Sequence, residues 1–167
     1  MKTSVTVTAI FNCSLERAFR CPMLCDITKV HTGYGMMPRV THVEQEKNWG
    51  QPGGAKRVFM ASSFAVKAGS SMTDKVVERR ENEYWKIELS DFTFFTWGFT
   101  KFTGEWLTKE LKPNEIQIIY TYTTEGNKPL FYPVNWLLTH LFWKVYLKKV
   151  LENIRKLACG NEPYQYA

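Results

Sequence analysis

The sequence predicts an α+β domain built around an antiparallel sheet. Three observations predict this class: the chain opens with strand-like alternation, continues into two short helical segments, and then carries about six strand-like segments before one closing helix. Helices and strands do not alternate, which argues against a parallel α/β sheet, and hairpin-length connections are typical of antiparallel pairing. The 167 residues fit one domain, expected over residues 1–167.

The N-terminal segment predicts a strand and then a helical pair. In SVTVTAIF, residues 4–11, apolar side chains occupy alternate positions. Asn12 or Ser14 can cap the first helix. We expect this helix to end at or before Pro22, because proline lacks the N–H that a helix interior needs. A second short helix is expected over about residues 24–30.

Turn residues divide the middle of the chain into strands. VTHVEQEKNW and AKRVFM flank the turn GQPGG, which predicts a hairpin. Further strands are expected near 69–80 and 83–91, joined by RREN. WGFTKFTGEWLTKEL and NEIQIIYTYTTE form the last pair. The loop HTGYGMMP, with two glycines and a proline, contributes Tyr34 and Met36.

The last two strands carry the candidate polar groups of an interior. Alternation in NEIQIIYTYTTE puts Ile116, Ile118, Tyr120 and Tyr122 on one face, so that two phenol hydroxyls point inward and need a partner. A ligand oxygen, the backbone or His140 could be that partner.

The strand before it is ambiguous, because both of its faces carry aromatic side chains. One orientation directs Phe95, Trp97, Phe99, Lys101 and Glu105 inward. The other orientation directs Phe94, Thr96, Phe102 and Trp106 inward.

The closing segment, FYPVNWLLTHLFWKVYLKKVLENIRKLACG, predicts a long helix. Its uncharged part, residues 129–143, spans roughly 22 Å as a helix. A bilayer core is roughly 30 Å thick and needs roughly 20 apolar residues, so a membrane span is not expected. At 100° per residue, the aliphatic stripe through Leu147 continues toward the N-terminus as Trp143, His140 and Trp136, which predicts a buried face of these three rings.

The sequence does not indicate what covers the other side of this helix. Leu138, Leu141 and Val145 lie there and give way to Lys148. Loop cover, a homodimer contact or an anionic membrane surface would each suit this side.

Charge and motifs exclude several function classes. The net charge of +6 comes without an RNP, zinc-finger or helix-turn-helix pattern, so nucleic acid is not an expected partner. No P-loop, GxSxG, HExxH or Rossmann fingerprint occurs, and neither metal nor cofactor is expected. Four cysteines without a CxxC pair, and an N-terminus without a secretory h-region, favour reduced thiols and a cytoplasmic protein.

The chain resembles the START-like (SRPBCC) helix-grip superfamily, which includes polyketide cyclase/dehydrase and lipid-transport-like proteins. The opening strand with CSLERAFRCPML, the hairpin PGGAKRV and the ending YLKKVLENIRKLA carry the resemblance in the family's order. The resemblance implies a seven-stranded curved antiparallel sheet wrapped around a long C-terminal helix, with two short helices after the first strand and a hydrophobic cavity between sheet and helix. It does not imply a particular reaction.

The expected function is binding, transport or sensing of a hydrophobic small molecule or lipid in that cavity. The alternatives are a cyclase or dehydratase that uses His140 with a tyrosine as acid and base, and a docking module that uses the outer helix face. The expected ligand-binding residues are Tyr34, Met36, Trp97, Phe99, Ile118, Tyr120, Tyr122, Trp136, His140 and Trp143.

Overall fold

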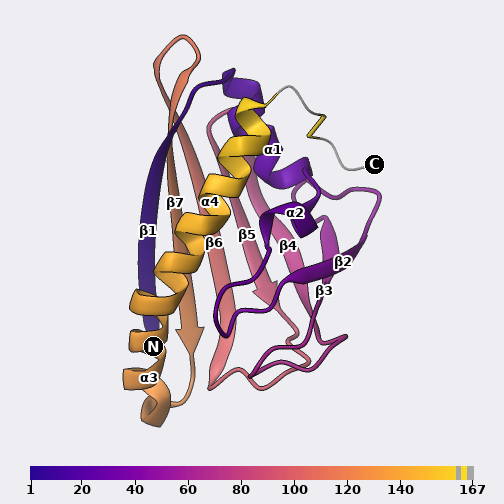
Figure 1. The fold of residues 1–167 in the computed structure, drawn as a ribbon, viewed down its shortest axis with the longest axis vertical. Coiled ribbons are helices and arrows are strands. Elements are labelled where there is room, and N and C mark those ends of the chain that lie inside the picture. The colour runs from indigo at the N-terminus through magenta and orange to yellow at the C-terminus, as the bar shows by residue number, and fades with distance from the viewer. Residues whose placement is uncertain (161–162, 165–167) are drawn as a thin grey trace.

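A computed structural model shows a seven-stranded antiparallel sheet that curves around a long C-terminal helix (Figure 1). It describes residues 1–160, 163 and 164. The strand order is β1-β7-β6-β5-β4-β3-β2. The strands are β1 (Lys2–Phe11), β2 (Val40–Gln45), β3 (Ala55–Met60), β4 (Ser71–Arg80), β5 (Tyr84–Ser90), β6 (Phe99–Lys112) and β7 (Glu115–Gly126). The helix-grip prediction is therefore confirmed.

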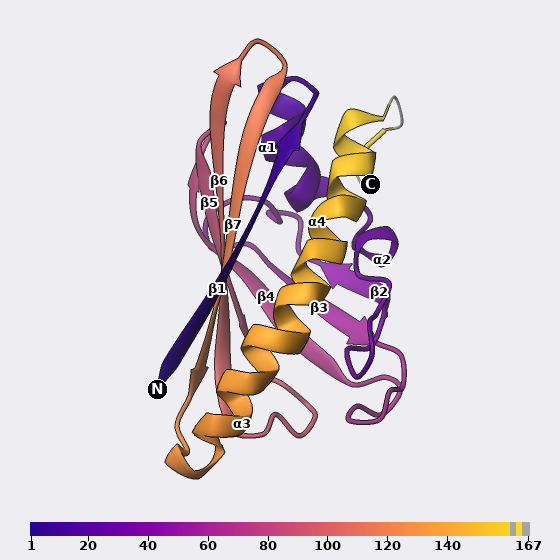
Figure 2. The ribbon, with the colours of Figure 1, turned by 60° about the vertical axis from the view of Figure 1, so that its left-hand side comes forward.

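The helices all lie on one side of this sheet. Figure 2 shows α4 crossing in front of the sheet, with α1 and α2 beside its C-terminal half. The helical elements are α1 (Leu15–Leu24), α2 (Ile27–Val30), η1 (Pro129–Phe131), α3 (Tyr132–Leu137), η2 (Leu138–Trp143) and α4 (Lys144–Cys159). No helix in the described part of the chain is long and apolar enough to cross a membrane. The cytoplasmic location stays a prediction.

The predicted inward face of the last strand is confirmed. Ile116 and Ile118 are fully buried, and Tyr120 and Tyr122 are each 4% exposed. β7 pairs with β1 along the whole length of β1, so that the alternating apolar residues of the two strands share one face. The long β6–β7 ladder extends this face toward the centre of the sheet.

The predicted end of the first helix is wrong. Ser14 caps α1 as expected, since its side chain accepts a hydrogen bond from the Arg17 amide. The helix continues through Pro22 to Leu24. Proline removes a single intrahelical bond near the helix end, whereas burial of Met23 and the bond from the Cys25 amide to the Cys21 carbonyl hold the last turn.

The closing helix is not a regular α-helix, and this overturns the predicted buried face. Residues 138–143 form a π-helical turn. A π turn holds one residue more than an α turn. The side chains on its N-terminal side are therefore rotated about the helix axis, relative to their positions in a regular α-helix. Asn135 and Thr139 are therefore buried, whereas Trp136 is 46% exposed and the ring of His140 stacks on it.

The outer side of this helix is apolar and exposed, as predicted for Leu141 and Val145, and Lys148 is exposed beside them. Leu138 is an exception, because the same rotation turns it toward the interior. The exposed large apolar residues between 129 and 146 are Leu130, Tyr132, Val134, Trp136, Leu137, Leu141, Phe142 and Val145.

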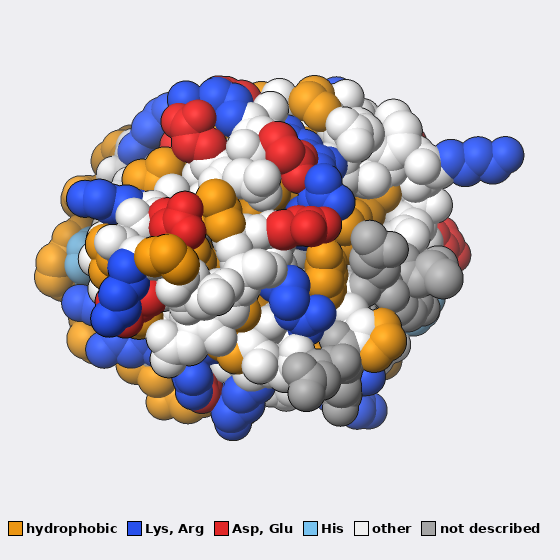
Figure 3. Space-filling model, turned by 90° about the horizontal axis from the view of Figure 1, so that it is seen from above, with side chains coloured by type: hydrophobic (Ala, Val, Ile, Leu, Met, Phe, Trp, Pro, Cys, Tyr) orange, Lys and Arg blue, Asp and Glu red, His pale blue; other side chains and the backbone are white. Residues whose placement is uncertain are grey.

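The opposite end of the molecule has a different surface. Figure 3 views the end where β6 joins β7 and α4 finishes, and acidic and basic side chains are interspersed over it. At this end Arg17 of α1 donates hydrogen bonds to the carbonyls of Leu157, Ala158 and Gly160. These bonds satisfy the C-terminal carbonyls of α4 and fasten it to α1.

Candidate functional site: a cavity between sheet and helix

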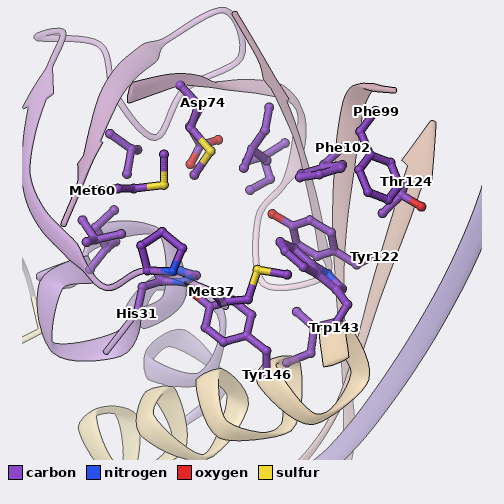
Figure 4. A pocket seen from close by; sticks show the side chains of 18 of the residues that line it. His31, Met37, Met60, Asp74, Phe99, Phe102, Tyr122, Thr124, Trp143 and Tyr146 are labelled. Carbon is purple, nitrogen blue, oxygen red and sulfur yellow. Dashed lines mark hydrogen bonds between the residues drawn. The ribbon is translucent and has the colours of Figure 1, made fainter. Parts of the chain in front are cut away.

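A mostly apolar cavity of about 160 Å³ lies between the curved sheet and the C-terminal helix. Strands β2 to β7 contribute residues on the sheet side, and α1, α2, η2 and α4 contribute residues on the helix side. The loops before β2 and after β2, β3 and β5 supply the remaining lining residues. Figure 4 shows Met37, Met60, His31, Tyr146 and Trp143 arranged around the open space.

An aromatic wall closes the cavity on the β6–β7 side. The ring of Trp143 lies 5.2 Å from those of both Phe102 and Tyr122, and 5.5 Å from that of Tyr146. Gly104 makes room for this wall, because a Cβ atom there would lie 2.9 Å from the Tyr122 ring. Rigid aromatic contacts of this kind favour a planar apolar ligand.

The loop between β5 and β6 forms one rim of the cavity. Phe94, Phe95, Thr96 and Trp97 all line it. Trp97 adopts a positive φ of 54°, a conformation that is uncommon for a bulky residue and clusters at binding sites. A register shift at the start of β6 then lets both Phe99 and Phe102 face inward.

Two opposite charges face each other inside this apolar space. Lys56 of β3 and Asp74 of β4 are directly opposed across the strands, with Nζ 3.6 Å from Oδ2. Their side chains are only 5% and 10% exposed. The Lys56 ammonium also lies 3.8 Å from the centre of the Trp49 ring, which is a cation–π distance.

Burial sets the electrostatics of this pair. Desolvation lowers the pKa of Lys56, and the Asp74 carboxylate opposes that change. Desolvation raises the pKa of Asp74, and the Lys56 ammonium opposes that change. The second oxygen of Asp74, Oδ1, is buried without a hydrogen-bond partner among the described residues. A buried carboxylate oxygen without a partner is costly, and a ligand donor would satisfy it.

A second polar contact lies beside the helix. His31 Nδ1 and the Tyr146 hydroxyl are 2.7 Å apart (Figure 4). Burial, together with the nearby Lys56 charge, lowers the pKa of His31 to about 4. The imidazole is therefore neutral at neutral pH, and it can serve as donor or acceptor according to its tautomer.

The remaining polar atoms of the wall are mostly donors. Burial raises the pKa values of Tyr120 and Tyr122, so both phenols stay protonated. The indole N–H groups of Trp85, Trp97 and Trp143 are buried without a partner in the described part of the chain. Each of these residues lines the cavity, so a ligand with acceptor atoms would suit them.

Six of the predicted ligand-binding residues line the cavity, and four do not. The six are Met36, Trp97, Phe99, Tyr120, Tyr122 and Trp143. Ile118 is buried in the core behind the cavity, and Tyr34 is 41% exposed, on the loop before β2. Trp136 and His140 lie on the outside of the helix because of the π turn, and the Nδ1 atom of His140 bonds to the Trp136 carbonyl.

The ambiguous strand is also resolved. Phe102 and Trp106 face inward, and Lys101 and Glu105 lie on the opposite face. There Lys101 bonds to Glu88 at 3.1 Å, and Glu105 accepts a bond from the Tyr84 hydroxyl at 2.6 Å. Neither charge enters the cavity.

His31, Lys56 and Asp74 were missing from the predicted site. Alternation in AKRVFM places Lys56 on the same face as Val58 and Met60, and alternation in SMTDKV places Asp74 with Val76. The pattern therefore held the signal for the two charges. The usual assumption that charged side chains face solvent hides it.

Comparisons with known proteins agree with the fold. No family model matches the chain, and no curated protein matches it in sequence. The crystal structure of Ara h 8.0201 is 14% identical with a TM-score of 0.70, covering 96% of this chain and 100% of its own. A norcoclaurine synthase point mutant from Thalictrum flavum, in complex with a transition-state analogue, is 11% identical with a TM-score of 0.67, covering 95% and 94%.

TTHA0849 from Thermus thermophilus has a similar relation, with 13% identity, a TM-score of 0.65, and coverage of 93% of this chain and 97% of its own. At such identities the likeness shows the helix-grip fold. This fold is compatible both with ligand binding and with catalysis, since one of the three structures is that of an enzyme with an analogue bound.

Proposed function

We propose that the protein binds a small, largely apolar molecule that carries a hydroxyl or carbonyl group. The observation that carries this proposal is the Lys56–Asp74 pair, two charges held inside an otherwise apolar cavity with one carboxylate oxygen unpartnered among the described residues. Such a pair is weak evidence for stability, because apolar residues of similar volume are often as stable. A ligand that uses both charges gives the pair a role.

The size of the cavity favours a small molecule over a long-chain lipid. Its 160 Å³ is close to the roughly 150 Å³ of an apolar cavity that admits benzene. It is smaller than the roughly 300–1,000 Å³ of sites for drug-sized ligands. Transfer of the ligand's apolar surface from water contributes about 25 cal/mol per Å², and the polar group fixes its orientation.

Matched aromatic probes test this proposal. Naphthalene and 2-naphthol differ by one hydroxyl, and we expect 2-naphthol to bind about tenfold more tightly in calorimetry, the equivalent of one good hydrogen bond. The Lys56→Met/Asp74→Leu double variant should bind both probes with the affinity of naphthalene. If the preference for 2-naphthol persists in that variant, or if neither probe binds the original protein, the proposal is wrong.

A second candidate function is acid–base or amine chemistry in the same cavity. Burial lowers the pKa of Lys56 and raises that of Asp74, and pKa shifts in these directions are typical of groups that act as nucleophiles or exchange protons in active sites. The predicted pairing of His140 with a tyrosine is not available for this chemistry, because His140 lies outside the cavity.

Trapping with an aldehyde distinguishes an enzyme of this kind from a simple binder. The Lys56 amine would condense with 2-naphthaldehyde and lose water, and cyanoborohydride would reduce the resulting imine by hydride transfer. Peptide mapping should then place the naphthylmethyl group on Lys56 ahead of the exposed lysines, and Lys56→Arg should remove it. If only exposed lysines are labelled, the protein has no reactive Lys56 amine, and the binding function stands alone.

A further inference from the structure

We propose that the outer side of the η1–α3–η2 segment docks on an anionic membrane surface and presents the mouth of the cavity to the bilayer. The starting observation is the exposure of large apolar side chains along this segment. Leu130 is 85% exposed, Leu141 55%, and Trp136 and Leu137 46% each. Single exposed apolar residues are common, but a contiguous group marks an interaction surface.

The exposed apolar residues of this segment lie away from its buried side. Leu130, Val134, Leu137, Leu141 and Val145 follow one another at intervals of three or four residues, and we call them the docking stripe. The opposite side carries Asn135 and Thr139, which are buried. Aromatic Tyr132 and Trp136, both partly exposed, accompany the stripe, and such rings favour the headgroup level of a membrane.

Charge distinguishes a membrane from other occupants. Residues 127–151 contain no Asp or Glu, and Lys128, Lys144 and Lys148 are exposed along this stretch. In a twofold dimer through this surface the same patch would face itself, so its lysines would meet a surface without acidic residues from this stretch, which is unfavourable. Anionic headgroups complement them, and an apolar stripe bordered by lysines is typical of helices that lie in the interface. The opposite end, in Figure 3, has mixed charges.

The cavity opens beside this surface. Phe95 lines the cavity and is nevertheless 61% exposed, and its ring lies 6.5 Å from that of Phe131 in η1. Leu138 and Thr139 of η2 line the cavity from the helix side. Figures 1 and 2 both place α3 and the β5–β6 loop at the same end of the molecule. Docking through the stripe would therefore let an apolar ligand pass between bilayer and cavity with little exposure to water.

Co-sedimentation with lipid vesicles tests the stripe. We expect the protein to bind phosphatidylcholine vesicles containing 30 mol% phosphatidylserine, and Leu137→Glu/Leu141→Glu to weaken this binding at least tenfold. Val77→Glu/Leu111→Glu is the matched control, because these residues are 43% and 46% exposed on strands and lie outside the stripe. An equal loss in both variants, or no binding by the original protein, would overturn the proposal.

The lysines are tested separately on the same vesicles. Lys144→Glu/Lys148→Glu should weaken binding by about fivefold or more per lysine at low salt, with a smaller effect as salt rises. Lys75→Glu/Lys109→Glu changes the net charge equally on exposed strand positions and should have a much smaller effect. Equal losses would mean general attraction of a basic protein and would overturn the docking geometry. A dimer that Leu137→Glu/Leu141→Glu dissociates, without vesicle binding, would assign the stripe to a second copy instead.

Discussion

At the scale of single residues, the cavity holds groups that ordinary cores avoid. Lys56 and Asp74 are a cross-strand pair with almost no access to water, and His31 is held neutral beside the Tyr146 hydroxyl. In each case the partner comes from another element: Asp74 of β4 pairs with Lys56 of β3, and Tyr146 of α4 contacts His31. Substitutions in the Lys56–Asp74 pair and at His31 should therefore change the free energy of unfolding, and the two effects can be measured separately.

Removing one charge of the Lys56–Asp74 pair should be far worse than removing both. Lys56→Met leaves the Asp74 carboxylate buried without its partner, at a cost of about 3–5 kcal/mol. The double variant Lys56→Met/Asp74→Leu should recover most of that loss or exceed the original stability, because it has no buried charge. Urea unfolding of the single and double variants measures this. Additive losses in the double variant would show that packing, not charge, governs the site.

His31 predicts a defined loss of stability in mild acid. Its pKa is about 4 in the folded protein and about 6.5 when unfolded, so the unfolded chain binds the proton more readily between these values. The free energy of unfolding should therefore fall as the pH drops from about 6.5 to 4, by at most about 3 kcal/mol from this group.

The variant His31→Asn keeps a polar atom near the position of Nδ1 without a titrating ring. Its unfolding free energy, followed from pH 7.5 to 4, should fall less steeply than that of the original protein. His42→Asn is the matched control, because it makes the same substitution at an exposed position. Parallel slopes for the original protein and His31→Asn would contradict the buried neutral histidine.

At the scale of elements, α4 is fastened at its C-terminal end. Arg17 donates to three carbonyls there, at 2.6, 2.7 and 3.0 Å, and thereby joins α1 to α4. Arg17→Leu should cost about 2–3 kcal/mol, since charged hydrogen bonds contribute about 1.5–3 kcal/mol. Arg20→Leu is the matched control, because Arg20 pairs with Glu16 and Glu81 at the surface and should cost below about 1 kcal/mol. Thermal unfolding compares the two, and similar losses would contradict this role of Arg17.

The elements also show what sequence patterns can and cannot predict. Strand alternation correctly predicts the inward faces of β1 and β7, because a pleat reverses at every residue. The helical projection fails at Trp136 and His140, because it assumes 100° per residue through a π turn. Even in strands, the register shift before Lys101 lets Phe99 join Phe102 on the inner face, which alternation alone does not anticipate.

At the scale of the whole molecule, the ends of the cavity differ in how firmly they are held. The β1–β7 and β6–β7 ladders are long, and the β6–β7 ladder is irregular only near its ends, whereas the loop 91–98 meets the segment 129–143 through the ring contact between Phe95 and Phe131. The fold could be predicted from the order of elements, and six of the ten predicted residues line the cavity, although their role in binding stays a prediction. Alternation places Lys56 and Asp74 each on an inner face, but no local pattern shows that β3 and β4 pair in the register that brings the two charges together.

This difference predicts a gradient in amide hydrogen exchange. We expect exchange to be slowest in β6, β7 and the C-terminal half of α4, and faster in 91–98 and 129–143. Addition of 2-naphthol should slow exchange in those two segments more than elsewhere, because they border the cavity. Uniform protection along the C-terminal helix would contradict a mouth at this end.

The π turn has a consequence for chain length. A regular α-helix that runs back from Leu147 would need one residue fewer to bring Thr139 and Asn135 to the cavity. Deleting Leu141, which is exposed, should therefore leave the same side chains on the inner wall while the segment becomes α-helical. The π turn therefore accommodates one additional residue, and that residue lies on the outer surface. Shortening the helix by one position would alter what the protein touches outside and leave the cavity walls as they are.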